Sequence, residues 1–594
     1  MNDKYQDFLN KLQSADESER DWLVMEFSLQ NLSETLQQAV WAAAIPHWFD
    51  HDFLNAVLAN PLKDSDFQAL TELSFIETYP ERGFNVHERS RNLLLNRLWA
   101  TNKTRYQKLS KRAAAYCKKQ DQNNTAWRVE SLYHGLLANS QTTKQAFINQ
   151  GLGWWNGSQF EKLEHLTSVV LEAVYSGKLT GDSAGYAHSF QAKVDNIYSR
   201  YESAKKHLYS ALAQNTQNKH LKVICLMELG RAHYHLNEYN LAPDYYQQAL
   251  KICQQVKDRV NEANCNYFLG DVHAQLNEYE LARKRYQQAL AIFQQFKQPL
   301  GEGNCLQSLG DVHLQLAEYK QARDNFQQAL ELYQKIKRPL SEANCISALG
   351  EMHNYLAEYG QAQDCYSQAL VIYQKINHRL GEANCLRFLG SLNGSQGQTE
   401  LAFTRLQQAA ELYKQMGDQR SKAACFDDLA RLYQRQKQFA PALAAFKQAI
   451  EIFPNAANFY INRAELYLQM EDYEKAGADI KQVEILDRNS AYTLSLTAAL
   501  ALWQQQPSQA VELCQQALAQ RPADGNFRAL FALALLANGQ AQAAYSEMEQ
   551  ALTAIYEQHD FDDLLDDLDK LAKIYGHSAD VDNLRKQILN RCQK

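Results

Sequence analysis

The chain has 594 residues, of which 45% are apolar and 22% charged, and its net charge is −7. It contains only 24 glycines and 10 prolines, too few to supply the turns of a β-sandwich, a β-barrel or a long series of βαβ units. The composition therefore predicts a mostly helical globular protein, excludes a disordered polyampholyte and provides no overall basic field for nucleic acid.

The N-terminal residues lack the apolar core of a signal peptide. No stretch reaches the ~20 apolar residues of a membrane helix. We therefore expect a cytoplasmic protein without a membrane partner.

Residues 1–125 show no internal repeat. Three helices are predicted over 32–44, 50–58 and 64–73, followed by a β-hairpin at 75–79 and 84–87 and a helix from Glu88. This order predicts a winged helix-turn-helix. The helix over 64–73, which would enter the major groove, carries Asp64, Asp66 and Glu72 but no Lys or Arg, so it would repel phosphates.

Residues 89–119 contain ten Lys or Arg and no Asp or Glu. One reading is a solvated helix that supports the wing, and a second is a patch for an acidic protein partner or for the chain's own Asp-rich tail. Nucleic acid is the least favoured ligand. The candidate patch consists of Arg89, Arg91, Arg97, Lys103, Arg105, Lys108, Lys111 and Arg112. Residues 126–182 are predicted to form irregular helical units that connect this domain to the rest.

A 40-residue repeat follows. Cys225, Cys265, Cys305, Cys345, Cys385 and Cys425 are 40 residues apart, with a glycine five positions after each of the first five. Apolar and small residues recur at helical spacing on both sides of a turn, so each unit is predicted to be a helical hairpin. The hairpins would bury one another's apolar faces. Equivalent cysteines would lie too far apart for disulfides, and they are expected to be small core residues.

This pattern resembles the tetratricopeptide repeat, and the 40-residue form is similar to repeats in kinesin light chains and in the helical arms of STAND ATPases. Past Ala430 the spacing shortens to 34, with Ala464, Ala498 and Ala532 at the glycine position. The resemblance implies an all-α, right-handed superhelical solenoid behind a small winged-helix-like domain. Its expected parts are 40-residue repeats over 183–450, 34-residue repeats over 451–555 and capping helices over 556–594.

The segments AAAIPHWF, LSFIETYPERGFNVHERSR and KRAAAYC resemble the winged-helix module of STAND ATPases. The chain lacks the G-x-x-x-x-G-K-[ST] loop of that family, since Gly177-Lys178 precedes Leu179 and Glu172 stands where the first loop glycine should be. A phosphate cradle and a Mg²⁺ hydroxyl are therefore missing. We expect no cofactor, no metal site and no enzymatic activity.

The resemblance also implies that the first helix of each hairpin lines a concave groove. Amide side chains near the helix starts could hold the main chain of an extended peptide, and their neighbours would select its side chains. The alternatives are that recent duplication copied these asparagines, or that they satisfy local backbone groups. The candidate residues are Asn264, Tyr267, Asp271, Asn304, Gln307, Asp311, Asn344, Ser347, Glu351, Asn384 and Arg387.

The acidic members, Asp271, Asp311 and Glu351, favour a basic or neutral segment. The sequence therefore predicts a non-catalytic adaptor that binds a protein or peptide in the groove. The alternative is a STAND-derived signalling or transcriptional regulator that binds a small effector or DNA.

Overall fold

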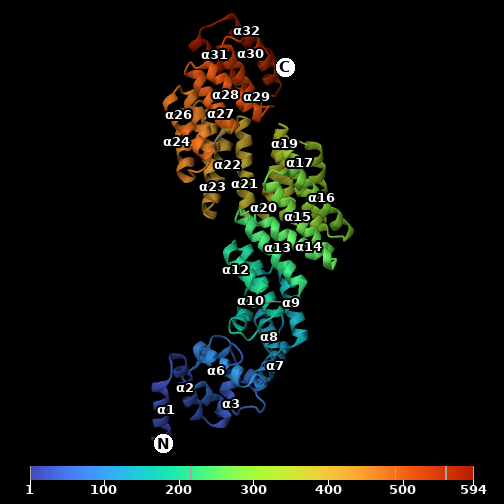
Figure 1. The fold of residues 1–594 in the computed structure, drawn as a ribbon, viewed down its shortest axis with the longest axis vertical. Helices are drawn as coiled ribbons and strands as arrows, with labels where there is room; N and C mark the ends of the chain where they lie inside the picture. The colour runs from blue at the N-terminus through green and yellow to red at the C-terminus, as the bar shows by residue number, and fades with distance from the viewer. Residues whose placement is uncertain are drawn as a thin grey trace. The chain divides into compact units, whose positions relative to one another are not determined.

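The structure is a computed structural model that describes residues 2–592 except 215–216, 317, 488–489, 523 and 555–557. The chain divides into two compact units, Met1–Leu316 and Ala317–Lys594, and each is described here by itself. Within the described residues there are 32 helices and one two-stranded sheet, so the expected all-α class is confirmed (Figure 1). Among these helices, none is both long enough and apolar enough to cross a lipid bilayer.

The N-terminal part of the first unit contains the helices and the hairpin in the expected order. Ser33 and Asp50 start two of the helices by accepting hydrogen bonds from the backbone N–H of Leu36 and Phe53. The strands are antiparallel, with Ile76 opposite Val86. The elements are α1 (Asn2–Ser14), α2 (Glu17–Gln30), α3 (Glu34–Ala43), α4 (His51–Val57), α5 (Asp64–Thr71), β1 (Ile76–Tyr79), β2 (Gly83–Val86), α6 (Glu88–Thr101) and α7 (Lys103–Lys119).

Three regular helices occupy the expected connector: α8 (Thr125–Leu137), α9 (Gln141–Asn156) and α10 (Phe160–Tyr175). A buried charge network joins them to the N-terminal helices. The imidazole of His47 contacts the carboxylate of Glu130 at 2.6 Å and that of Glu172 at 3.1 Å, and Glu130 also contacts His134 at 3.0 Å. Among the described residues, no three His, Cys, Asp or Glu side chains converge as a metal site requires.

Helical hairpins fill the rest of the first unit. The elements are α11 (Asp182–Ile197), α12 (Tyr201–Leu212), α13 (Lys219–His235), α14 (Ala242–Val256), α15 (Arg259–Gln275), α16 (Tyr279–Gln295) and α17 (Pro299–Gln315).

The second unit consists of helices throughout. They are α18 (Tyr319–Lys335), α19 (Pro339–Tyr355), α20 (Tyr359–Lys375), α21 (Arg379–Ser395), α22 (Thr399–Met416), α23 (Gln419–Arg435), α24 (Phe439–Ile452), α25 (Ala457–Gln469), α26 (Tyr473–Leu486), α27 (Ala491–Trp503), α28 (Pro507–Gln520), α29 (Gly525–Ala537), α30 (Ala541–Ala554), α31 (Gln558–Tyr575) and α32 (Ala579–Cys592).

Close packing explains the repeated glycines. A Cβ added at Gly270 would lie 2.5 Å from the ring of Tyr286, and one at Gly350 would lie 2.9 Å from the ring of Tyr366. The six repeated cysteines are fully buried and free, as expected for small core residues. His273 and His353 each contact a glutamate five residues later, Glu278 at 2.6 Å and Glu358 at 2.5 Å, across the hairpin turn. The periodic residues therefore serve packing and turn formation.

The odd-numbered helices from α13 to α29 are here called first helices, and the even-numbered helices from α14 to α30 second helices. Successive first helices contact one another directly, as α13 does with α15 and α15 with α17 in the first unit, and as α21 does with α23 and α23 with α25 in the second. The second helices pack mainly against the first helices on either side. Within each unit the first helices therefore line the crowded inner face, which we call the groove.

Candidate functional site

In the first unit, the groove is hollowed between the C-terminal halves of α13, α15 and α17. A cavity of about 370 Å³ lies there, lined by three tyrosines and two carboxylates. Asp271 and Asp311, both expected from the sequence, line this cavity, whereas Asn264, Tyr267, Asn304 and Gln307 are not among its lining residues. The hollow is thus about two helical turns beyond the asparagines.

The carboxyl group of Asp271 has a pKa well above its ordinary value. The hydroxyl of Tyr286 donates a hydrogen bond to it at 2.8 Å. The pKa of Asp271 is raised to about 7, mainly by burial; the hydrogen bond from Tyr286 opposes the shift and the nearby charge of Asp311 adds to it. A cationic group placed in this cavity would stabilise the ionised carboxylate.

In the second unit, an ion-pair network runs along the groove. Arg387, an expected site residue, contacts the carboxylate of Asp428 at 2.6 Å. Arg431 contacts Asp428 at 2.5 Å and Asp427 at 3.6 Å, and Asn462 donates to Asp427 at 2.8 Å. A smaller cavity of about 210 Å³ adjoins Asp428 and Arg431. The arginines in this stretch neutralise the acidic charge.

The asparagines are oriented by tyrosines of the second helices. The hydroxyl of Tyr373 donates to Oδ1 of Asn344 at 2.6 Å, and that of Tyr413 donates to Oδ1 of Asn384 at 2.5 Å. Asn264 instead donates to Oδ1 of Asn261 at 3.2 Å. In Asn344 and Asn384 the fixed oxygen leaves the Nδ2 group as the available hydrogen-bond donor.

The remaining expected groove residues differ in their surroundings. The hydroxyl of Tyr267 lies 3.3 Å from that of Ser308 on the next first helix. Ser347 lies within hydrogen-bonding reach of the thiol of Cys385. Burial raises the pKa of Glu351.

The expected basic patch is only partly exposed. Arg91 is buried and donates to the carbonyl oxygens of Ala44 and Ile45, so it is not part of a surface patch. The signal for its burial was its helical spacing from the apolar residues Leu94, Leu95 and Leu98, which places it on the same face of α6. Among the others, Arg89 pairs with Asp21, and Arg112 donates to Val57 O.

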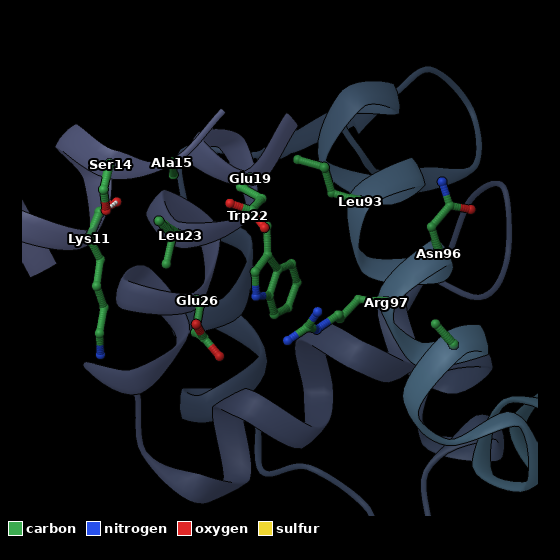
Figure 2. Close-up of a pocket in the computed structure, with 11 residues that line it drawn as sticks. Lys11, Ser14, Ala15, Glu19, Trp22, Leu23, Glu26, Leu93, Asn96 and Arg97 are labelled. Atoms are coloured by element: carbon green, nitrogen blue, oxygen red, sulfur yellow. Dashed lines mark hydrogen bonds between the residues drawn. The ribbon is translucent and has the colours of Figure 1, made fainter. Parts of the chain in front are cut away.

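Arg97 borders a separate hollow between α1, α2 and α6. This hollow has a volume of about 560 Å³. The guanidinium of Arg97 lies 4.9 Å from the centre of the Trp22 ring, and Figure 2 shows that ring between Glu26 and Arg97. Lys103 lies over Trp99 at 4.5 Å. Arg105 is half-buried, while Lys108 and Lys111 are exposed. The exposed positive charge is therefore concentrated on α7.

Sequence reasoning did not identify the residues that shape the cavities most directly, the ring of Tyr286 and the arginine Arg431. Tyr286 packs against the repeat glycine Gly270, so its place in the sequence is explained by packing and gave no separate signal. Arg431 could have been found from its position, because it occupies the same place in its repeat as Asp271 and Asp311.

Comparison with known proteins supports the repeat assignment. Residues 222–295, 261–335, 342–415 and 396–455 match one family model described as tetratricopeptide repeat, and residues 433–500 match a second with the same description. None of the curated proteins matches the chain significantly.

Several solved structures are similar to this chain. A Rap protein complexed with competence and sporulation factor is 14% identical, with a TM-score of 0.46 over 58% of this chain and 97% of that protein. A STAND protein with a tetratricopeptide repeat sensor from Pyrococcus horikoshii is 16% identical, with a TM-score of 0.43 over 75% and 66%. Aspartyl phosphate phosphatase F from Bacillus subtilis is 16% identical, with a TM-score of 0.41 over 60% and 92%.

Proposed function

Because residues 222–335 and 342–500 are tetratricopeptide repeats, we propose that this protein is a non-catalytic adaptor that binds an extended polypeptide along its groove. The observation that carries the proposal is the cavity lined by Asp271, Asp311 and three tyrosines in the first unit. Carboxylates beside aromatic faces suit a Lys or Arg side chain, because the charge pairs with the carboxylate and the rings attract the cation.

The oriented asparagines supply main-chain recognition in the second unit. Nδ2 of Asn344 and of Asn384 is held by the tyrosine bond to Oδ1, so it is arranged in advance to donate to a peptide carbonyl. Fixing the donor before binding reduces the entropy lost on association. The proposed ligand is therefore an extended segment with basic side chains.

A random peptide library displayed on phage, selected on the full chain, tests this function. We expect peptides enriched in Lys and Arg, and at least 10-fold weaker binding, by fluorescence anisotropy, to Asp271→Lys with Asp311→Lys. The matched control is Asp324→Lys with Glu331→Lys, which makes the same change in net charge on exposed positions of the second helix α18.

Two outcomes would contradict the proposal. If no peptide is enriched, the groove is not a peptide site. If both charge-reversed proteins bind equally, the cavity does not select basic residues. A further variant in which Asn264, Asn304, Asn344 and Asn384 are all changed to Ala measures the main-chain contribution separately.

A second candidate partner is suggested by α7, the last helix of the proposed winged-helix-like domain over residues 1–125. It carries seven Lys or Arg and no acidic residue, and Lys108, Lys111, Lys118 and Lys119 are exposed. We propose that this face binds an acidic protein segment.

Anisotropy with a polyglutamate peptide and with duplex DNA, each at two salt concentrations, tests the α7 proposal. Binding of the peptide that is lost in Lys108→Glu with Lys111→Glu supports it. Salt-sensitive binding of the DNA alone contradicts it and favours a regulator that binds DNA.

A further inference from the structure

Another cavity lies in the second unit, where α31, the helix before the last, covers the groove. It has a volume of about 410 Å³, opens to solvent, and is lined mainly by α31 and the first helices α25, α27 and α29. Its walls combine aliphatic and aromatic surface, such as Leu496, Trp503 and Phe527, with carboxylates that come from different helices.

Two of these carboxylates, Glu465 on α25 and Asp567 on α31, line the cavity from different helices. Glu465 is exposed and Asp567 is half-buried, and neither side chain forms an ion pair or a hydrogen bond with another residue that the structure describes. Loss of hydration raises the pKa of each to about 7; Arg431 and Lys570, respectively, oppose the shift, and the charge of Asp563 adds to both. These two positive charges do not restore the ordinary pKa values, so a further cation in the cavity would stabilise both carboxylates.

The chain's own Lys570 shows how an ammonium group is held at the edge of this cavity. Its Nζ donates to the carbonyl oxygen of Leu468 at 2.7 Å and lies 4.6 Å from the ring centre of Trp503 and 5.3 Å from that of Tyr473. Leu468 and Trp503 also line the cavity. Lys570 occupies these groups, and its contacts show that aromatic faces and a carbonyl oxygen of this lining can hold a primary amine.

α31 restricts what else can enter. The hydroxyl of Tyr575 donates to Leu502 O at 2.6 Å, and Lys437 pairs with Asp566 at 3.1 Å, so both halves of the helix are tied across the groove. An extended polypeptide would have to displace these contacts. A thin, flexible aliphatic chain needs no such displacement.

We propose that the cavity beneath α31 binds a linear aliphatic polyamine, with its ammonium groups at Glu465 and Asp567 and its methylene chain against the apolar wall. This site is a different one from the peptide cavity of the first unit. The polyamine proposal does not depend on peptide binding in that cavity. The ligand's volume is smaller than the cavity, so it can bind while α31 stays in place.

Calorimetric titration of the full chain with spermidine at physiological ionic strength tests this site. We expect one molecule bound per chain, at least 10-fold weaker binding to Glu465→Gln with Asp567→Asn, and at least 10-fold weaker binding of butylamine to the wild type. The control is Glu549→Gln, which removes a single exposed charge on α30 outside the cavity and should change the affinity by less than 2-fold.

Circular dichroism of each variant confirms that the helices remain folded. Binding of several spermidine molecules that is equally weakened by Glu549→Gln would overturn the proposal, because it would indicate a general surface effect. Absence of binding, or equal affinity for butylamine, would overturn it as well. Displacement of spermidine by an oligolysine peptide, with a matching loss in the double variant, would reassign the cavity to lysine side chains and also overturn it.

Discussion

The groove of the first unit and that of the second use the same pair of repeat positions in opposite ways. In the first unit, Tyr267 contacts Ser308 on the next first helix through their hydroxyls. In the second, Arg387 and Asp428 occupy the same two positions, 41 residues apart, and form an ion pair. The repeat decides which positions meet, and the residue types decide whether the charge of the groove remains available to a ligand or is neutralised internally.

The same contrast holds one position after the repeat glycine. Asp271 and Asp311 stand there in the first unit, while Ser391 and Arg431 stand there in α21 and α23. The first unit therefore has an open acidic cavity, and this stretch of the second has an internally balanced one. Three predictions test this difference, in order of decreasing effect.

Arg431→Ala should have the largest effect. The carboxylates of Asp427 and Asp428 are buried, and removing the arginine leaves them with only Arg387 and Asn462. We expect the free energy of unfolding to fall by about 2 kcal/mol, which is less than for a fully buried pair because Arg431 itself is about half exposed. Thermal unfolding and hydrogen exchange in α21–α25 measure it. Arg420→Ala, on the same helix but exposed, should cost less than about 0.5 kcal/mol, and an equal loss in both variants would contradict the network's role.

Asp271→Asn should have the opposite effect and increase the free energy of unfolding. Its native pKa of about 7 exceeds the ordinary value, so the folded state holds its proton more tightly, and stability falls as the pH rises from about 4 to about 7. At pH 4 the carboxyl group is protonated in the folded state and about half protonated in the unfolded state, so we expect the variant to be nearly as stable as the wild type there. At pH 8 we expect the variant to be more stable by at least about 1 kcal/mol.

Thermal unfolding between pH 4 and pH 8 measures this difference. Asp364→Asn, at an exposed position of α20, serves as the control and should show no such pH dependence. A stabilisation of Asp271→Asn that is the same at both pH values would show that proton binding is not its cause.

Tyr373→Phe should have the smallest effect on stability. It removes the hydrogen bond to Asn344 and makes this repeat resemble the one in which Phe293 stands at the equivalent position. We expect the free energy of unfolding to fall by about 0.5–1 kcal/mol. If the oriented amide donates to the ligand, peptide binding should also become weaker. Tyr175→Phe, whose ring is 70% exposed, is the control. Unchanged stability would mean that the asparagine is not held by this bond.

Much of the fold could be predicted from the sequence because the periodic residues act locally. The 40-residue spacing of Cys265 and Cys305 and the close packing at Gly270 require only neighbouring helices, and the order of helices and hairpin in residues 1–125 follows from short segments. The site was less predictable. Asp271 and Asp311 were identified as groove residues, but the burial of Arg91 and the pairing of Arg387 depend on residues far away in the sequence.

The sequence by itself determined the repeat and its helical hairpins, because those features follow from apolar periodicity and from small residues at fixed positions. The expectation that the first helices face inward came from the resemblance to the tetratricopeptide repeat. Only the tertiary structure decided which groove charges are neutralised. It also placed the cavities at the C-terminal halves of the first helices and brought α31 back across the groove. Ion pairs and cavities depend on side chains from different repeats within a few ångströms of one another, and their electrostatic energies change with burial that no single repeat encodes.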